Sequence, residues 1–189
     1  MKRKNLYLKW KDKNQIVEIL NNGGVGVVPT ETVFGIIGKP DKTKRINEIK
    51  KSPENKPLTF FIGNHKQVNT LWDPIPKPFS QAIQHWPGPF TLLAGSPLVG
   101  IRMPDVEELC EIINETSPLA STSANLSGED TSTTIEGMSE AFLEEVDFII
   151  DESIENQSNR ASTILKIEDN RVSIIREGFL TMEDLNIKQ

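Results

Sequence analysis

The sequence contains very little cysteine and histidine among its 189 residues. The single cysteine, Cys110, cannot form a disulfide within the chain, so the fold depends on a hydrophobic core, which a chain of this length can bury. Cys110 lies in VEELCEII, where apolar residues recur at helical spacing; this pattern predicts a small core residue of a helix in a reducing compartment. The only histidines are His65 and His85. One cysteine and two histidines argue against a protein-ligated zinc site, and neither histidine has the sequence context of a Ser-His-Asp hydrolase.

Long apolar runs are also absent. No stretch approaches the roughly 20 apolar residues that a membrane-spanning helix needs. The N-terminal segment MKRKNLYLKWKDK begins with basic residues, as a signal peptide does, but Lys9, Lys11 and Lys13 interrupt any apolar run. We therefore expect a soluble protein of the cytoplasm that makes no contact with a membrane.

Basic residues are missing from one long part of the chain and concentrated in another. Residues 103–159 contain no Lys or Arg, whereas residues 39–66 contain eight of them against three acidic residues. The formal net charge of −6 argues against a general nucleic-acid-binding protein, which is usually basic. The basic segment is either a solvated face or an anion site, and the charges alone leave both interpretations open.

Alternating strand and helix patterns predict an α/β (α+β) fold around one sheet. Short apolar runs bounded by turn residues predict buried strands at residues 25–29 and 58–62. Between them DKTKRINEIKK predicts a helix with Asp41 as its N-cap. Further strand candidates are FTLLA, LVGIRM, DFIID, ASTILKI and RVSIIRE, and further helix candidates are DVEELCEIINE and IEGMSEAFLEE. Since we find no repeat and no linker, we expect residues 1–189 to form a single domain.

Polar residues collect where the predicted strands end. PTET at residues 29–32 follows one strand, STSAN at residues 121–125 follows another, Arg102 ends VGIR, and IREG at residues 175–178 closes a last one. Polar groups at strand ends build the ligand crevices of open α/β sheets. Taken one at a time, each segment also suits an ordinary polar turn. No Walker P-loop and no GxGxxG motif is present.

Seven segments in a fixed order make residues 23–178 similar to the YrdC/TsaC family of threonylcarbamoyl-AMP synthases. They are GGVGVVPTETVFGI, KPLTFFI, WPGPFTLL, VGIRMP, PLASTSANLSG, RASTIL and IIREG. The resemblance implies a YrdC-like fold, an open twisted mixed sheet whose concave face is the substrate cleft. It is to the short, single-domain form of the family.

The resemblance also implies a reaction, catalysed by an ATP-dependent nucleotidyltransferase. Such an enzyme makes L-threonylcarbamoyl-adenylate from L-threonine, bicarbonate or CO2, and ATP with Mg²⁺, and it releases pyrophosphate. A separate transferase complex then moves the threonylcarbamoyl group to an adenosine of tRNA. The reaction needs no covalent enzyme nucleophile, and we assign neither a catalytic residue nor a protein ligand for Mg²⁺. Because the net charge is negative, we expect contact with tRNA to be weak or indirect.

The resemblance places residues at two ends of the cleft. The predicted L-threonine-binding residues are Thr30, Arg102, Ser123 and Ser162. The predicted ATP-binding residues are Lys50, Lys56, Asn125 and Arg176. A guanidinium is a natural bidentate partner for the carboxylate of threonine. The alternatives are a structural ion pair with an acidic helix for Arg102, turn hydrogen bonds for the hydroxyls, and an ordinary surface position for Lys50.

One position departs from the family pattern. The family has Lys-x-Arg before its PL dipeptide, and this chain has Lys50, Lys51 and Ser52 there. Losing a charged contact to a phosphate or carboxylate costs about 1.5–3 kcal/mol when nothing replaces it. Lys51 and Lys56 are the candidates to replace it, since a lysine binds phosphate as a point charge. Ser52 therefore bears on activity more than on fold.

Two other functions remain open at this point. A nucleic-acid-binding module without catalysis would use the basic segment, although the net acidity and the lack of an aromatic stacking platform count against it. A carbamoyl-adenylate-forming relative, similar to the YrdC-like domain of hydrogenase maturation factors, would keep the nucleotide cleft and change the small substrate.

Overall fold

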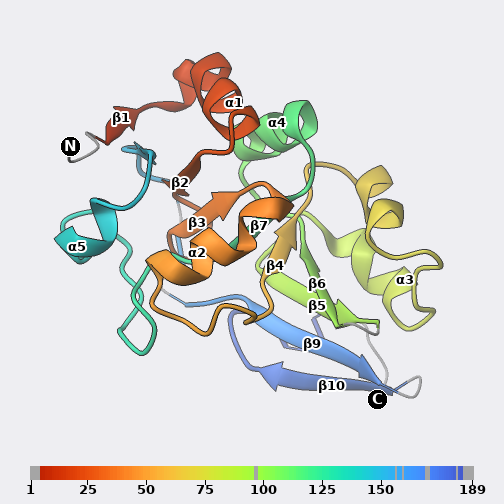
Figure 1. The fold of residues 1–189 in the computed structure, drawn as a ribbon. Coiled ribbons are helices and arrows are strands. Elements are labelled where there is room, and N and C mark those ends of the chain that lie inside the picture. Colours follow the sequence, from red (N-terminus) through yellow and green to blue (C-terminus); the bar gives the residue numbers. More distant parts are fainter. Residues whose placement is uncertain are drawn as a thin grey trace.

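The computed structural model describes residues 5–95, 98–155, 157–158, 160–168, 171–181 and 183–184. One mixed sheet runs through them with the strand order β1-β8-β2-β3-β7-β4-β6-β5-β9-β10. Helices lie against this sheet, and β1 and β10 form its two edges (Figure 1). The arrangement confirms the predicted α/β fold with a mixed sheet.

The strands are short, and their bounds follow the apolar runs of the sequence. They are β1 Leu6–Leu8, β2 Val25–Val28, β3 Gly35–Gly38, β4 Thr59–Phe61, β5 Phe90–Ala94, β6 Val99–Arg102, β7 Leu119–Ser123, β8 Phe148–Ile150, β9 Thr163–Glu168 and β10 Arg171–Arg176. The α-helices are α1 Lys13–Asn21, α2 Thr43–Ile49, α3 Phe79–Ala82, α4 Glu107–Thr116 and α5 Glu140–Leu143. The 3-10 helices are η1 Trp10–Asp12, η2 Pro40–Lys42, η3 His65–Thr70 and η4 Ile83–His85.

Two helix predictions were wrong in detail. Asp41 does not cap α2, because it lies inside η2, pairs with Lys42 at 2.8 Å, and leaves Lys42 as the N-cap. The helix predicted for IEGMSEAFLEE is reduced to the single turn of α5. At the start of the predicted segment, the Gly137 N–H donates to Thr134 Oγ1 at 3.2 Å, and Thr134 is in turn bonded to Ser132. These local bonds compete with helix formation, as serine and threonine commonly do.

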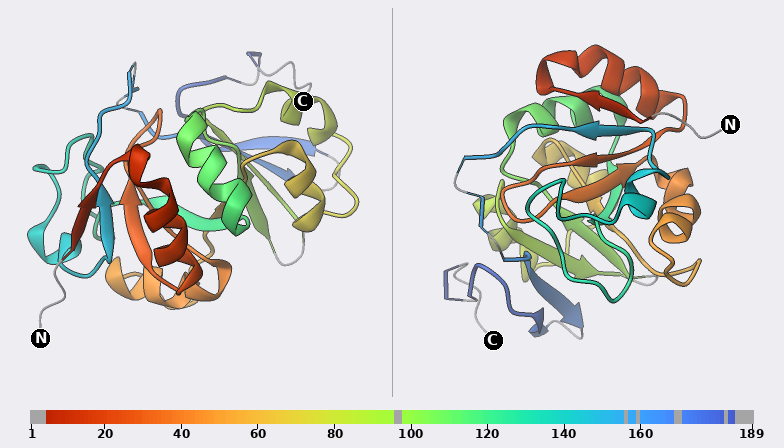
Figure 2. Two further views of the ribbon diagram at one scale, coloured as in Figure 1. Left: turned by 90° about the horizontal axis from the view of Figure 1, so that it is seen from above. Right: turned by 90° about the vertical axis from the view of Figure 1, so that its left-hand side faces the viewer.

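Alternation along β3 explains how the sheet separates two cores. Ile36 packs with residues of α2 and α5, whereas its neighbour Ile37 packs with residues of α1 and α4. Successive side chains of a strand point to opposite faces, so one apolar strand serves both layers. Figure 2 shows α1 and α4 side by side over one face and α2 on the other. A third cluster packs around Phe79 and Phe90, under α3.

Strand register brings the predicted polar segments together. Gly35 of β3 pairs with Ser123 of β7, and Phe61 of β4 pairs with Arg102 of β6. After β10, the chain returns against the start of β9, where a Cβ at Gly178 would overlap the backbone of Ala161. Only glycine permits this approach. The ends of β6, β7 and β10 therefore converge with the loop between β2 and β3, here called the β2–β3 loop (residues 29–34).

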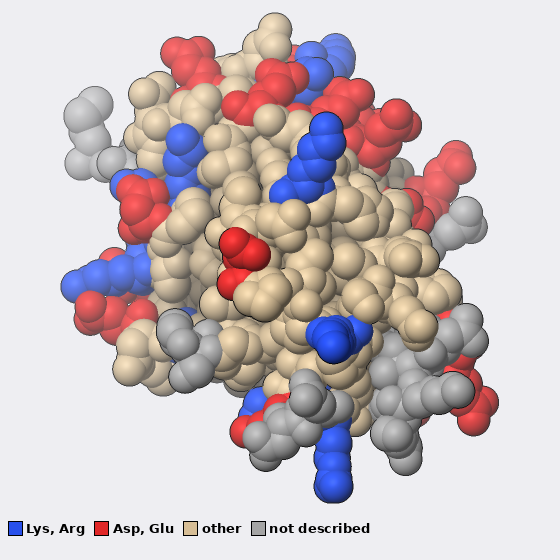
Figure 3. Space-filling model, turned by 90° about the vertical axis from the view of Figure 1, so that its right-hand side faces the viewer, with Lys and Arg blue, Asp and Glu red and all other residues tan. Residues whose placement is uncertain are grey.

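Charged side chains are unevenly distributed over the surface. On the face that Figure 3 presents, carboxylates gather toward the end of the molecule that carries α1 and α4, and few charged side chains lie in the middle. None of the helices in the described part of the chain combines the length and hydrophobicity that crossing a bilayer requires.

Candidate functional site

A cavity of about 290 Å³ opens where the polar segments converge. Its walls come from the β2–β3 loop, the start of β4, the ends of β6 and β7, and the residues next to β9 and β10. Six of the eight predicted site residues line it: Thr30, Lys56, Arg102, Ser123, Ser162 and Arg176. We call this space the Arg102 cavity.

Thr30 is fixed by the turn that it forms. Its hydroxyl donates to the Val33 carbonyl at 2.6 Å and accepts from the Thr32 N–H at 3.2 Å. Gln157 Nε2 donates to the Thr30 carbonyl at 2.8 Å. The Thr32 hydroxyl lies 2.9 Å from that of Thr30. Because a hydroxyl has one hydrogen and two lone pairs, these three contacts engage the Thr30 hydroxyl fully within the β2–β3 loop.

Arg102 is buried and paired with a carboxylate of the β2–β3 loop. Its Nη2 donates to Glu31 Oε1 at 2.7 Å and to Thr32 Oγ1 at 2.9 Å, and the guanidinium carbon lies 5.5 Å from the centre of the Phe61 ring. The side chain is 6% exposed and that of Glu31 is 13% exposed. Arg102 Nε and Glu31 Oε2 are buried without a hydrogen-bond partner among the described residues. The pair therefore retains a donor and an acceptor for further contacts.

Arg176 also lines the cavity, and it anchors Ser162. Its Nε and Nη2 donate to the Ser162 carbonyl at 3.1 and 2.9 Å, and Nη2 also donates to Ser162 Oγ at 3.1 Å. The Ser162 hydroxyl lies 3.2 Å from that of Thr91. Partial burial and then the positive charge of Arg102 lower the pKa of Arg176. Two cations that repel each other across one cavity create a favourable potential for an anion.

Lys50 and Asn125 lie beside the cavity, and neither belongs to its lining. The Lys50 ammonium donates to the backbone carbonyls of Ser123 and Asn125, the latter at 2.7 Å, and to Asn125 Oδ1 at 3.2 Å. Ser123 Oγ donates to Asn125 Oδ1 at 2.6 Å. Burial, followed by the charge of Lys56, lowers the pKa of Lys50 to about 8. Contact of Lys50 and Asn125 with ATP stays a prediction, and the structure gives both residues partners within the protein.

Sequence reasoning assigned no role to two residues that the geometry makes prominent. Glu31 is the carboxylate partner of Arg102, and Ser121 lines the cavity with a buried hydroxyl that has no partner within the described residues. Both stand inside segments that the sequence analysis singled out. No local pattern could indicate that Glu31 pairs with Arg102, because these residues lie 71 positions apart and only the fold brings them together.

The segment that departs from the family pattern lies close to the cavity. Lys51 is exposed and has a positive φ of 51°, whereas Lys56 lines the cavity. Ser52 Oγ is buried and lacks a hydrogen-bond partner in the described part of the chain. Of the two lysines expected to replace the family arginine, Lys56 is therefore the one that the fold brings to the site.

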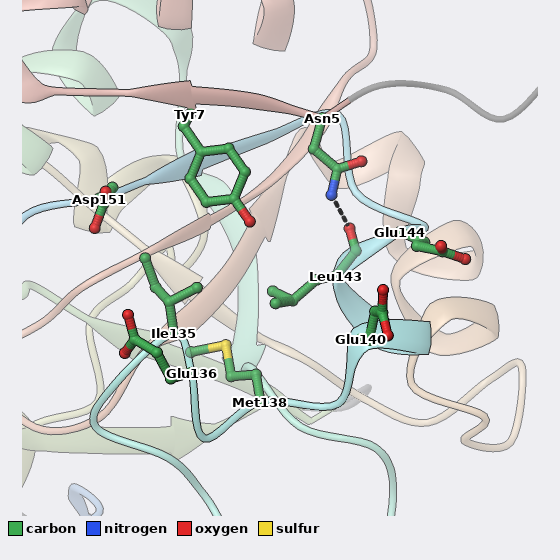
Figure 4. A pocket seen from close by; sticks show the side chains of 9 residues that line it. All are labelled: Asn5, Tyr7, Ile135, Glu136, Met138, Glu140, Leu143, Glu144 and Asp151. Atoms are coloured by element: carbon green, nitrogen blue, oxygen red, sulfur yellow. Dashed lines mark hydrogen bonds between the residues drawn. The ribbon is translucent and has the colours of Figure 1, made fainter.

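Other hollows of the surface carry the opposite charge. Figure 4 shows one of about 430 Å³ between β1 and α5, with Tyr7, Ile135, Met138 and Leu143 surrounded by carboxylates. Another, of about 810 Å³, is lined by several acidic residues that include Asp105. Carboxylates repel phosphates, so the smaller Arg102 cavity is the better anion site. No group of three or more His, Cys, Asp or Glu residues suited to hold a metal occurs among the described residues.

A match to a family model shows to which protein family the chain belongs. The model of the Sua5/YciO/YrdC family, described as "Telomere recombination", matches residues 18–178. The chain belongs to this family. The predicted resemblance is thereby confirmed, and the Arg102 cavity lies within the matched region.

Curated members of the Sua5/YciO/YrdC family include close relatives in archaea and bacteria. A Methanocaldococcus jannaschii protein, provisionally named a threonylcarbamoyl-AMP synthase, is 31% identical over 94% of this chain and 93% of its own length. The threonylcarbamoyl-AMP synthase of Bacillus subtilis is 30% identical over 90% of this chain and 54% of its own length. The chain thus spans about half the length of the longer relative.

Solved structures of the family share the fold. The crystal structure of Pyrococcus abyssi Sua5 complexed with L-threonine matches 96% of this chain and 59% of that chain, with a TM-score of 0.84 and 26% identity. The structure of Escherichia coli YciO matches 96% of this chain and 98% of that chain, with a TM-score of 0.81. At 21% identity, the likeness to YciO concerns the fold alone.

Proposed function

We propose that this chain synthesises L-threonylcarbamoyl-adenylate from L-threonine, bicarbonate or CO2, and ATP, with release of pyrophosphate. One observation carries the proposal: three cationic side chains and several hydroxyls converge on one cavity in a member of the Sua5/YciO/YrdC family. The names of the curated relatives and the complex of Pyrococcus abyssi Sua5 with L-threonine support this choice of substrates.

The part of the cavity around Arg102 suits an amino acid. The whole cavity has a volume of about 290 Å³, at the lower limit of the roughly 300–1,000 Å³ of small-molecule pockets. A guanidinium has five N–H donors, and the hydrogen bonds of Arg102 to Glu31 and Thr32 use only Nη2. Donors are therefore left for the carboxylate of threonine, and the hydroxyls of Ser121 and Ser162 are placed for its ammonium and hydroxyl groups, in the cavity that Thr30 also lines.

Arg176 and Lys56 provide the positive charge for the phosphates of ATP. Lys56 takes the place of the family arginine that is Ser52 here, because it is the nearby lysine that lines the cavity. We infer that Mg²⁺ enters with ATP, since substrate phosphates together with one or two carboxylates are its usual ligands.

The reaction then proceeds without a covalent intermediate on the protein. The neutral amine of threonine adds to CO2 and gives a carbamate, with release of one proton to water. A carbamate oxygen attacks the α-phosphorus of ATP, and the bond to the pyrophosphate oxygen breaks. The side chains contribute by positioning both substrates and by neutralising charge on the phosphates. The product passes to a separate threonylcarbamoyl transferase complex in the cytoplasm, and tRNA contacts this chain weakly or indirectly.

The test is incubation of the protein with ATP, Mg²⁺, bicarbonate and each amino acid in turn, with product masses read directly. We expect threonylcarbamoyl-AMP and pyrophosphate only when threonine and bicarbonate are both present. Formation of ADP, or equal turnover with serine and glycine, would contradict the proposal. Carbamoyl phosphate in place of threonine and bicarbonate separates this activity from a carbamoyl-adenylate-forming relative. Tight, tRNA-selective binding at physiological salt would favour a nucleic-acid-binding module.

A further inference from the structure

The edge of the sheet at β1 carries exposed apolar side chains. Leu6 is 42% exposed and Tyr7 is 59% exposed. Tyr7 points into the hollow between β1 and α5, toward Ile135 and Met138 (Figure 4). In the strand order of the described sheet β1 stands last and pairs with β8. Its other side can therefore pair with a strand from another chain.

The backbone of Tyr7 faces this open side. The Leu6 N–H donates to the Asp147 carbonyl at 3.2 Å. The Leu8 carbonyl accepts from the Asp151 N–H at 2.9 Å. Leu6 and Leu8 thus use their backbone groups toward β8, to which β1 runs parallel. Because alternate residues of a strand bond to opposite sides, the N–H and carbonyl of Tyr7 point away from β8.

Carboxylates surround the apolar side chains at this edge. Glu136 and Asp151 lie on one side of the hollow, and Glu140 and Glu144 lie on the other (Figure 4). The hollow of about 810 Å³ also includes Asp151, and so adjoins the first. It adds the carboxylates of Asp105, Glu107, Glu108, Glu152 and Glu155. Among the described residues that line the two hollows, Lys9 is the one cation.

This charge decides which kind of molecule fits the edge. Nucleic acids and anionic lipids would be repelled. Two copies of this chain paired through β1 would bring their carboxylates together, which is also unfavourable. A basic segment of another protein meets neither obstacle. Glu136, Glu140 and Asp151 take part in none of the ion pairs within the described residues, so their charges are available to such a segment.

We propose that the β1 edge is a docking surface for a partner protein, which adds an extended segment with Lys or Arg residues around an apolar residue. The segment pairs with the backbone of Tyr7, and its apolar side chain covers the hollow beside Tyr7. Main-chain hydrogen bonds then provide affinity, and the side chains provide specificity. The two hollows share no lining residue with the Arg102 cavity, so docking here does not depend on the proposed function.

The first experiment observes Tyr7 directly. Tyr7 is the only tyrosine of the chain, so incorporated fluorotyrosine gives one ¹⁹F signal at the docking surface. The probe is a capped peptide of alternating Lys and Leu residues, added to the full-length protein. We expect a saturable shift of the signal, and weaker binding as salt is added, because exposed charges are screened.

Two control peptides test the chemistry of the occupant. One has Glu in place of Lys, and the other has Gly in place of Leu. Each should bind at least about tenfold more weakly, since one loses the ion pairs and the other loses the apolar contact. Binding of either control peptide as tight as that of the Lys and Leu peptide would overturn the proposal, and so would a Tyr7 signal that the Lys and Leu peptide leaves unshifted.

Paired variants test the named carboxylates. Glu136→Gln combined with Asp151→Asn should weaken peptide binding about fivefold, as the loss of two exposed ion pairs allows. Glu18→Gln combined with Glu48→Gln makes the same change in net charge at exposed positions outside both hollows. This control should leave the affinity within about twofold, because distant charges are screened. Equal weakening in both double variants would mean that net charge alone attracts the peptide, against the proposal.

A last pair of peptides tests pairing with the backbone. One is N-methylated at its leucines and the other at its lysines, and only one of these sets can face β1. One of the two peptides should therefore bind about tenfold more weakly, because its N–H donors are lost. Undiminished binding of both would refute strand pairing.

The same ¹⁹F signal identifies competing occupants. A signal that shifts with protein concentration, without peptide, would assign the edge to a second copy of this chain. A gain in peptide affinity when the basic residues 2–4 are replaced by Gln would assign it to the chain's own N-terminus. Either outcome would contradict docking of a partner protein.

Discussion

Arg102 and Lys50 are both buried cations at the site, but their partners differ. Arg102 lines the cavity, pairs with the Glu31 carboxylate at 2.7 Å, and has an Nε without a partner among the described residues. Lys50 lies outside the lining, and its ammonium donates to neutral oxygens of Ser123 and Asn125. A charge-compensated guanidinium with spare donors can bind an anion at once, whereas the Lys50 ammonium would first have to exchange a bond to the protein for one to a ligand. The partners of a buried cation therefore matter as much as its charge.

Removing Arg102 should have the largest effect. Arg102→Ala leaves Glu31 buried without its partner, and breaking a buried ion pair in this way costs about 3–5 kcal/mol of stability. Urea unfolding should show this loss. If enough protein folds for assay, its threonine requirement should rise by more than about tenfold while its ATP requirement stays nearly constant.

A double replacement separates stability from binding at this position. Arg102→Leu combined with Glu31→Leu should regain most of the stability, since apolar residues of similar volume often replace buried pairs without loss. It should not regain threonine-dependent activity. Unchanged threonine dependence in Arg102→Ala would remove this residue from the threonine end of the site.

The second prediction concerns the lysine that replaces the family arginine. Lys56→Ala should raise the ATP requirement roughly tenfold to hundredfold, which corresponds to about 1.5–3 kcal/mol for a lost charged contact. Lys51→Ala, at an exposed position outside the cavity lining, is the matched control and should change little. Ser52→Arg should also have little effect. A tenfold improvement in Ser52→Arg would mean instead that nothing compensates for the missing arginine.

The third prediction uses the pH dependence of stability. Burial lowers the pKa of Lys50 from 10.5 to about 8. Between these values the unfolded chain binds more protons at this site than the folded chain does, so the contribution of Lys50 to stability rises with pH. Below about pH 8 the cost of burying the charge is fully present. The stability of the unmodified protein minus that of Lys50→Met should therefore rise between about pH 8 and 10.5. A flat difference in urea unfolding would contradict the burial of a charged lysine.

Local patterns predicted more of the fold than of the site. Apolar runs located most of the strands but not β1 and β3, which are short and were not predicted. Polar segments at strand ends located six of eight predicted residues in one cavity. The partners of those residues could not be predicted, because they depend on pairing between distant strands. Glu31 meets Arg102 across 71 positions, and Lys50 meets Ser123 and Asn125 across 73 and 75 positions. Nothing in the sequence around Lys50 distinguishes a buried ammonium from the exposed one of Lys51.

The last prediction has the smallest expected effect, and it uses the reactivity of Cys110 to report the charge on Glu31. Burial, followed by the negative charge of Glu31, raises the pKa of Cys110 to about 12, and its thiol donates to the Pro104 carbonyl at 3.2 Å. Since the thiolate is the reactive form, native Cys110 should resist iodoacetamide at pH 8 and react after unfolding. Glu31→Gln removes one negative charge and should speed alkylation about twofold, a change of about 0.3 in pKa. Arg102→Ala, which also destabilises the site but keeps the carboxylate, should not lower the thiol pKa. Equal acceleration in both variants would show that local opening controls the rate, and that Glu31 and Cys110 are not coupled through charge.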